Sequence, residues 1–534
     1  MFKGFMVDGK PFYSVGGQVH NASSDQIKNL EWGIRAVQAV KGNTIAVPLY
    51  WYKLEPQEGV YDMSQVLDVL QRVRKAGLKL VFLWFGAAKN ATIKYAPAYV
   101  KEDMGRFERV IDQCGEPGVI LSPYCRATIE ADKACFVRVM RTIHACDKDG
   151  TVLSVQVENE VGAGHVTGRD WGKTATEAYE GPVPQELLQF IAARGCGQPY
   201  DAWRAMGSPA SGSWAEVFGK HGAEYAMAWA YARAIDEIAA AGKAEHDVMM
   251  YVNAALDQNK WNFAGVNYSA GGPVSTVIDV YRCGAPHIDV VAPDIYRTDD
   301  VIYDYFMRAY ARDDNPLYIP ESGTGYANER MIFKAIAEYD SIGHHVFGIE
   351  RYIDADGNLE ADTLPMAKSL RIVANACPLI NRFRGTGNIR YIAQRYGQTE
   401  ERVDMGDWLG WVQFGYTTEG GRTGTDYLHR HMDECQPEWG RGLIFVAGPS
   451  EFYVVGDAFR IFLRRKDWPR DGRVRAVDAI EHIQGRVVNY TVHTEGLFDE
   501  CGEYVVNRDR NGDEDDFGIW VTEDVGVVHV KVTD

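Results

Sequence analysis

The sequence predicts an α/β fold, namely a (β/α)8 barrel followed by an all-β, sandwich-like accessory domain. Up to about residue 378, short apolar runs alternate with segments of helical spacing, and eight such units follow one another from Tyr13 onward. Beyond this point the chain consists of short β-type runs separated by turn residues. The length of 534 residues also exceeds what one compact core usually holds. We therefore expect a barrel domain over residues 1–378 and an all-β domain over residues 379–534.

The first unit is preceded by a hairpin signal at Asp8-Gly9. The expected barrel strands are residues 11–15, 44–49, 78–85, 152–157, 248–252, 288–292, 317–319 and 345–349. The expected helices have apolar residues three and four positions apart and cover residues 24–40, 63–75, 135–146, 223–241, 274–281, 301–312, 330–339 and 365–376. The run at 78–85 is almost entirely apolar, as a strand buried on both faces should be.

An open, doubly wound sheet is the alternative for this alternation of strands and helices. However, no Gly-rich phosphate-binding loop follows the first strand, and eight units favour the closed TIM barrel. Two long segments, residues 89–126 and 162–213, are rich in Gly, Pro and aromatic residues, and each follows a barrel strand. We expect both to lie over the carboxyl face of the barrel, where active sites form.

The composition is that of a globular protein, with 46% hydrophobic and 24% charged residues. A net charge of −18 disfavours nucleic acid and anionic membranes as partners. No apolar run of 18 residues is present, so we expect no membrane span. Nine scattered cysteines and an N-terminus without a secretory layout predict a cytoplasmic protein. An exported form that has lost its leader is the alternative.

Two predicted barrel strands end in a glutamate. The run at 154–160 ends in Asn159-Glu160 just before Gly162, and the run at 316–321 ends in Glu321, which follows Glu160 by 161 residues. Two carboxyl groups facing each other across one pocket are the machinery of glycoside hydrolysis. Glu160 fits the proton donor and Glu321 the nucleophile. The alternative for each glutamate is structural, a pair with an arginine or a helix cap.

Strict alternation along the first of these strands would put Glu158 and Glu160 on one face and turn Asn159 away. For Asn159 and Glu160 to share the pocket, the strand must end or kink near Gly162.

Polar and aromatic residues follow the other predicted strands, and together they suit a sugar with apolar faces and many hydroxyls. Each one alone is more often structural than catalytic. The candidates for substrate binding are His20, Tyr50, Glu55, Trp84, Asn90, Asn159, Asn253 and Tyr296.

Other chemistries lack their sequence signals. There is no GxSxG, Walker loop or HExxH motif. His344 and His345 are adjacent rather than four residues apart, which makes them a poor metal pair. We therefore expect no cofactor and no metal.

Three segments resemble glycoside hydrolase family 35. They are residues 17–21 (GQVHN), the run from Asn43 through residues 55–62 (EPQEGVYD), and residues 155–160 (VQVENE). The nearest resemblance is to a bacterial branch of β-galactosidase-like enzymes with a C-terminal β domain of unassigned function, in which residues 83–86 and 319–321 also have counterparts. The separation of 161 residues between the two glutamates is nearer to family 42.

The resemblance implies a retaining exo-glycosidase on a (β/α)8 barrel. Carried over residue by residue, it makes Glu160 the acid/base and Glu321 the nucleophile. Asn159 would then bind the sugar 2-hydroxyl, and Tyr296 would hydrogen-bond the nucleophile.

The leading hypothesis is thus a retaining exo-β-glycosidase, with β-galactosidase as the first specificity to consider and an oligosaccharide or glycoside as its substrate. A glucosidase or arabinosidase is the second hypothesis. A non-catalytic carbohydrate-binding barrel is the third, although the presence of both carboxylates argues against it. An accessory β domain would also suit a homo-oligomer.

Overall fold

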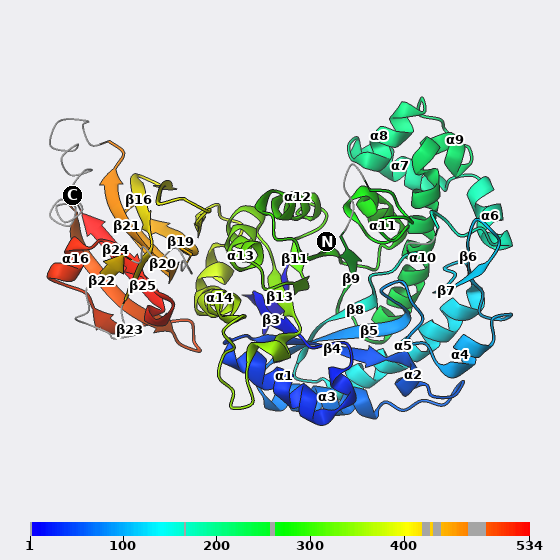
Figure 1. Ribbon diagram of the computed structural model, residues 1–534, viewed down its shortest axis with the longest axis horizontal. Helices are drawn as coiled ribbons and strands as arrows, with labels where there is room; N and C mark the ends of the chain where they lie inside the picture. The colour runs from blue at the N-terminus through cyan, green and yellow to red at the C-terminus, as the bar shows by residue number, and fades with distance from the viewer. Residues whose placement is uncertain are drawn as a thin grey trace.

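The computed structural model describes residues 3–164, 167–256, 262–418, 428–430, 439–467 and 488–533. Figure 1 shows a helix-covered barrel with a smaller β domain beside it. The predicted hairpin is present as β1 (Phe5–Val7) and β2 (Lys10–Phe12). Its turn residues Asp8 and Gly9 have φ values of 51° and 74°, the left-handed conformation that such tight turns require.

The barrel prediction is confirmed. Parallel strands surround one axis in the order β3, β4, β5, β8, β9 and β10, and β13 returns to pair with β3. Their bounds are β3 Ser14–Gln18, β4 Thr44–Tyr50, β5 Lys79–Lys89, β8 Val152–Asn159, β9 Met249–Ala255, β10 Val290–Ile295 and β13 Gly343–Phe347.

The remaining strand of the barrel is divided at Pro320. Its first part, β11 (Tyr318–Ile319), pairs with β13, and its second part, β12 (Glu321–Ser322), pairs with β10. Proline has no N–H to donate to a neighbouring strand. The sheet therefore closes across this residue, and the described segments form a nearly closed barrel in which Glu321 begins the second part.

The helices predicted from spacing cover the outside of the barrel in the expected order (Figure 1). They are α1 Ile27–Ala39, α3 Ser64–Lys75, α5 Arg126–Cys146, α10 Gly222–Glu245, α11 Ile278–Gly284, α12 Asp300–Tyr310, α13 Tyr326–Tyr339 and α14 Leu364–Phe383. Short helix α2 (Trp51–Leu54) follows β4. No helix in the described ranges is long and apolar enough to cross a membrane.

The two long segments after barrel strands contain structure of their own. The first holds α4 (Ala98–Glu102) and the hairpin of β6 (Arg109–Ile111) and β7 (Pro117–Leu121). The second holds α6 Lys173–Glu180, α7 Gln185–Arg194 and α8 Gln198–Ala205, with α9 (Trp214–Phe218) just beyond it.

The C-terminal part is all-β and antiparallel, as predicted. One sheet has the order β14-β19-β20-β25-β22-β23 and the other β15-β16-β21-β24. The bounds are β14 Ile389–Ala393, β15 Glu400–Met405, β16 Trp408–Phe414, β19 Arg441–Gly448, β20 Glu451–Asp457, β21 Phe459–Arg465, β22 Asn489–Phe498, β23 Tyr504–Asp509, β24 Ile519–Val521 and β25 Val527–Thr533. A short pair, β17 (Tyr416–Thr418) and β18 (Leu428–Arg430), lies beside them in the sequence. Both large sheets contribute to one apolar cluster, which makes the domain a sandwich.

The six-stranded sheet is covered on both faces. Along β19, Leu443 and Phe445 belong to the apolar cluster shared with the barrel helices, whereas Ile444 between them faces the four-stranded sheet. Helix α14 packs against this sheet and runs to Phe383. The boundary predicted at residue 378 thus lies inside α14, and the first strand of the sandwich begins at Ile389.

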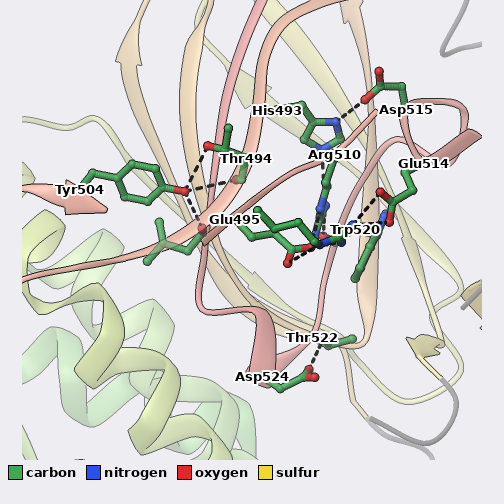
Figure 2. A network of polar contacts seen from close by, with 12 residues as sticks. His493, Thr494, Glu495, Tyr504, Arg510, Glu514, Asp515, Trp520, Thr522 and Asp524 are labelled. Atoms are coloured by element: carbon green, nitrogen blue, oxygen red, sulfur yellow. Dashed lines mark hydrogen bonds and ion pairs between the residues drawn. The ribbon is translucent and has the colours of Figure 1, made fainter. Parts of the chain in front are cut away.

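An acidic tract at residues 507–516 ends in a short helix, α16 (Asp513–Asp516). Figure 2 shows why this tract is ordered. Glu495 on β22 accepts from Arg510 Nε at 2.8 Å, and the Arg510 guanidinium lies 3.6 Å from the centre of the Trp520 ring. His493 lies 2.7 Å from Asp515. The network anchors the tract to the sheet.

Candidate active site

Glu321 is placed by the second part of the divided strand. In the register of the parallel pair, Glu321 on β12 lies beside Asp294 on β10, and neighbouring positions on parallel strands face the same side of the sheet. Both side chains are nearly buried. The break at Pro320 thus delivers the predicted nucleophile to the carboxyl face of the barrel.

Glu160 is placed by a distortion at the end of β8. Glu158 and Glu160 have φ values of 62° and 45°, which non-glycine residues rarely adopt and which often mark functional sites. The alternation of the strand therefore fails here, and Glu158 turns outward while Asn159 and Glu160 face the barrel centre. This is the kink that the sequence requires for Asn159 and Glu160 to share one pocket.

The two glutamates meet. One carboxylate oxygen from each of Glu160, Asp294 and Glu321 lies within 4.8 Å of the others. Glu160 is 9% exposed and Glu321 3% exposed, so both carboxylates are largely shielded from water. A separation near 5 Å is typical of retaining glycosidases, and inverting enzymes need a wider gap for a water molecule.

Three side chains donate to the Glu321 carboxylate. Gln18 Nε2 lies 3.0 Å from Oε1, Asn253 Nδ2 lies 3.5 Å from the same oxygen, and the Tyr296 hydroxyl donates to Oε2 at 2.7 Å. Burial, followed by the nearby carboxylates of Glu321 and Asp294, raises the pKa of the Tyr296 hydroxyl far above its ordinary value. Tyr296 therefore stays a proton donor, and the carboxylate of Glu321 is held in one orientation.

Glu160 is held from both sides. The Asn90 amide donates to Glu160 Oε2, and the Glu160 backbone N–H donates to Asn253 Oδ1 at 3.0 Å. Asn253 Nδ2 also lies 3.2 Å from one end of the Asn159 amide, and the Lys89 ammonium lies 2.9 Å from the other end, where the amide oxygen accepts from it. Asn253 thus connects the strand of Glu160 to the carboxylate of Glu321.

Asp294 is a third carboxyl group in the centre. Its Oδ2 accepts from Asn253 Nδ2 at 2.7 Å. Burial, followed by repulsion from Glu321 and Glu160, raises its pKa well above the ordinary value. We therefore expect Asp294 to hold a proton in the free site, which limits the charge carried by three adjacent carboxyl groups.

A second pair of carboxyl groups lies behind the barrel wall. Glu158 and Asp132 of α5 are both buried, and the backbone N–H groups of Ala87 and Ala88 donate to them at 2.7 to 3.1 Å. Burial raises the pKa of each, and for Glu158 repulsion from Asp132 adds to this effect. One shared proton accounts for the close approach of the two carboxyls.

This pair also shapes the strand that carries Asn90. The register between β5 and β8 shifts between Trp84 and Lys89, which is a bulge. Within the bulge, a Cβ on Gly86 would approach Asp132 Oδ2 to 2.5 Å and Glu158 Oε1 to 2.7 Å. Only glycine fits there, and the bulge redirects the chain so that Lys89 and Asn90 reach the centre.

The structure brings Glu160, Glu321, Asn90, Asn159, Asn253 and Tyr296 together, and it places four other predicted residues elsewhere. Trp84 is fully buried and donates to Asp132 Oδ1 at 2.8 Å. Glu55 accepts from Trp51 Nε1 at 2.8 Å and caps a turn at Gly59. Both side chains are thus bonded to other parts of the protein rather than to the three carboxyl groups of the centre.

The other two displaced candidates are Tyr50 and His20. Tyr50 is buried among aromatic rings, stacked on Tyr95 at 5.3 Å, and accepts from Ser24 Oγ. His20 is exposed at the rim, with its ring edge against Phe347 at 4.9 Å. Position after a strand does not say which way a side chain points. Trp84 points outward, Glu55 and His20 lie past their strand ends, and Tyr50 packs in the apolar cluster inside the barrel.

Gln18 and Asp294 are not among the site residues predicted from the sequence. Gln18 lies within β3, two positions before His20, and Asp294 within β10, two before Tyr296. The alternation of inward and outward positions would have found both, had the ends of these strands been known.

Residues 366–522 match a family described as a domain of unknown function (DUF5597). No protein of curated function matches the sequence.

Several solved glycoside hydrolases are similar in structure. They include the catalytic domain of β-amylase from Paenibacillus polymyxa (12% identity, TM-score 0.48, covering 66% of this chain and 96% of that one). Others are β-galactosidases from Rahnella sp. R3 (15%, 0.47, 72% and 58%) and from Bacillus circulans sp. alkalophilus (14%, 0.48, 70% and 57%). The chain thus spans little more than half of the two β-galactosidase chains. At these identities the similarity concerns the fold alone.

Proposed function

We propose that the chain is a retaining exo-β-glycosidase, and that a terminal β-galactosyl residue is its first substrate to test. The observation that carries the proposal is the approach of Glu160 and Glu321 to within 4.8 Å at the carboxyl end of a (β/α)8 barrel. This spacing, measured between one oxygen of each glutamate, is the short one of retaining enzymes rather than the wider one of inverting enzymes, and it favours attack by one carboxylate on the sugar. The shielded centre supports the release of a terminal sugar.

In this mechanism, Glu321 attacks the anomeric carbon while Glu160 protonates the departing oxygen. The bond to the leaving group breaks, and a glycosyl ester forms on Glu321. Glu160, now ionised, removes a proton from water, which attacks the same carbon and releases the sugar with its configuration retained. Tyr296, Gln18 and Asn253 hold the carboxylate of Glu321 for attack, and Asn90 orients Glu160.

A panel of 4-nitrophenyl glycosides tests the activity and identifies the sugar. Faster hydrolysis of a β-glucoside or an α-arabinoside than of the β-galactoside would favour the second hypothesis. No hydrolysis of any member, together with sugar binding, would favour a binding barrel. NMR of the first product should show the β-anomer, and an α-anomer would exclude the retaining mechanism.

Two variants test the roles of the glutamates. Glu321→Gly should be inactive and should form an α-glycosyl azide when azide is added. Glu160→Ala should lose far more activity on glycosides with poor leaving groups than on activated ones, and equal loss on both would contradict its role as the acid. Glu350→Gln is the matched control, because Glu350 also follows a barrel strand but bonds the backbone N–H of His20 at the rim.

A further inference from the structure

A cavity of about 940 Å³ lies among the segments that follow the barrel strands, and Arg297 is the lining residue nearest along the chain to the catalytic centre. Its walls come from the segments that follow β8, β9 and β10 and from the start of α10. Arg297 in this wall directly follows Tyr296, whose hydroxyl bonds Glu321. The volume is that of a site for a ligand larger than one ring.

The lining of this cavity is dominated by apolar side chains that are open to solvent. Val301, Ile302 and Tyr305 of α12 are 78%, 44% and 47% exposed, and Phe263 in the segment after β9 is 68% exposed. Single exposed apolar residues are common, but a group of them around one hollow marks a binding surface.

Two charged groups of the cavity, Glu224 and Arg297, are engaged with the protein. Glu224 Oε1 accepts from the Tyr268 hydroxyl at 2.8 Å and from Thr276 Oγ1 at 3.2 Å. Arg297 Nη2 donates to the Leu256 carbonyl at 3.0 Å. A sugar ring needs many hydrogen-bonding partners that are not spent on the protein, whereas an aromatic ring needs apolar contact. The exposed apolar part of the lining, with Phe263 and Tyr305, therefore fits an aromatic group.

The chain that follows the proposed proton donor also leads to this cavity. The proton donor Glu160 faces the leaving oxygen, and the chain after Glu160 packs directly on the segment that walls the cavity. Ala163 N donates to the Ala270 carbonyl at 2.8 Å, and Gly164 N donates to Ser269 Oγ at 2.9 Å. Gly168, further along the same segment, lines the cavity itself.

We propose that this cavity holds the leaving group, and that the enzyme acts on β-glycosides with an aromatic aglycone rather than on oligosaccharides. The inference rests on the proposed glycosidase function and extends it to the class of substrate. Contact with Tyr305 and Phe263 would hold the aromatic ring while Glu160 protonates the oxygen that joins it to the sugar.

The test compares benzyl and methyl β-glycosides of the sugar found in the nitrophenyl panel. Benzyl alcohol and methanol have similar acidity, so the comparison isolates binding of the ring. We expect kcat/KM to be at least about tenfold higher for the benzyl glycoside and higher than for a disaccharide of the same sugar. Tyr305→Ala and Phe263→Ala should each lower the benzyl value about three- to tenfold, as the loss of one aromatic contact does, and leave the methyl value unchanged. Tyr396→Ala is the matched control, because Tyr396 is a fully exposed tyrosine of the accessory domain, outside the cavity lining.

Equal kcat/KM for the benzyl and methyl glycosides, a faster disaccharide, or variants that lower both glycosides alike would overturn the inference. Calorimetry with the non-hydrolysable benzyl and methyl thioglycosides separates it from the proposed function. If no glycoside is cleaved but the benzyl thioglycoside binds more tightly than the methyl one, and Tyr305→Ala abolishes the difference, the cavity assignment stands and the enzymatic proposal fails. If cleavage occurs and the two thioglycosides bind equally, the cavity assignment fails alone.

Discussion

Removal of one hydroxyl, in Tyr296→Phe, tests how the proposed nucleophile is held. The hydroxyl donates to Glu321 Oε2 at 2.7 Å, and a hydrogen bond to a charged group contributes about 1.5–3 kcal/mol. Since about 1.4 kcal/mol corresponds to a factor of ten in rate, kcat/KM should fall about 10- to 150-fold. The loss should be partial, because Gln18 and Asn253 still donate to the same carboxylate.

The assay is steady-state hydrolysis of the best nitrophenyl glycoside, with thermal unfolding measured alongside. The Tyr296 side chain is 44% exposed, so the melting temperature should change little. Tyr396→Phe removes a hydroxyl from an exposed tyrosine of the accessory domain and should leave the rate unchanged. A fall of less than about twofold in Tyr296→Phe would refute the assignment, because it would show that this bond is not used in the transition state.

Three further predictions follow from the contacts around the centre. Asn90→Ala removes the donor to Glu160, so kcat/KM should fall about tenfold on alkyl glycosides and less on dinitrophenyl ones; an equal fall on both would contradict its action through the acid. Trp84→Phe leaves Asp132 Oδ1 without its indole donor. Urea titration should therefore show a loss of about 1–3 kcal/mol in unfolding free energy, with KM unchanged. A raised KM at unchanged stability would instead support the sugar contact predicted for Trp84 from the sequence. Burial raises the pKa of Glu158 above its ordinary value of 4.5. The stability that the protonated Glu158 contributes is therefore complete below pH 4.5 and is lost as the pH rises through the folded-state pKa. The loss is up to about 1.4 kcal/mol per pH unit. Glu158→Gln cannot ionise, so it should gain stability relative to the wild type as the pH rises above 4.5; unfolding curves whose difference is constant with pH would exclude a shared proton.

The order of the barrel elements could be predicted because it depends on local pattern. A continuous apolar run, such as residues 78–85, indicates a strand buried on two faces. Apolar residues at helical spacing, as at residues 63–75, indicate a helix buried on one face. The bounds could not be predicted as well: α5 begins at Arg126, nine residues before the predicted start, because its first turns are held by packing on α10 rather than by an apolar stripe.

The sequence by itself determined the eight βα units, the all-β C-terminal part and the two strand-terminal glutamates, because each is encoded in residues that are neighbours along the chain. Only the tertiary structure decided which strand-end side chains reach the centre. The bulge in β5, the left-handed residues 158 and 160 and the break at Pro320 each rotate the chain at one point. Such rotations are stabilised by partners distant in sequence, as Asp132 stabilises the bulge at Ala87. For this reason Gln18 and Asp294 contact the centre although they were not predicted to, and Trp84 and Glu55 bond other parts of the protein although they were predicted to bind substrate.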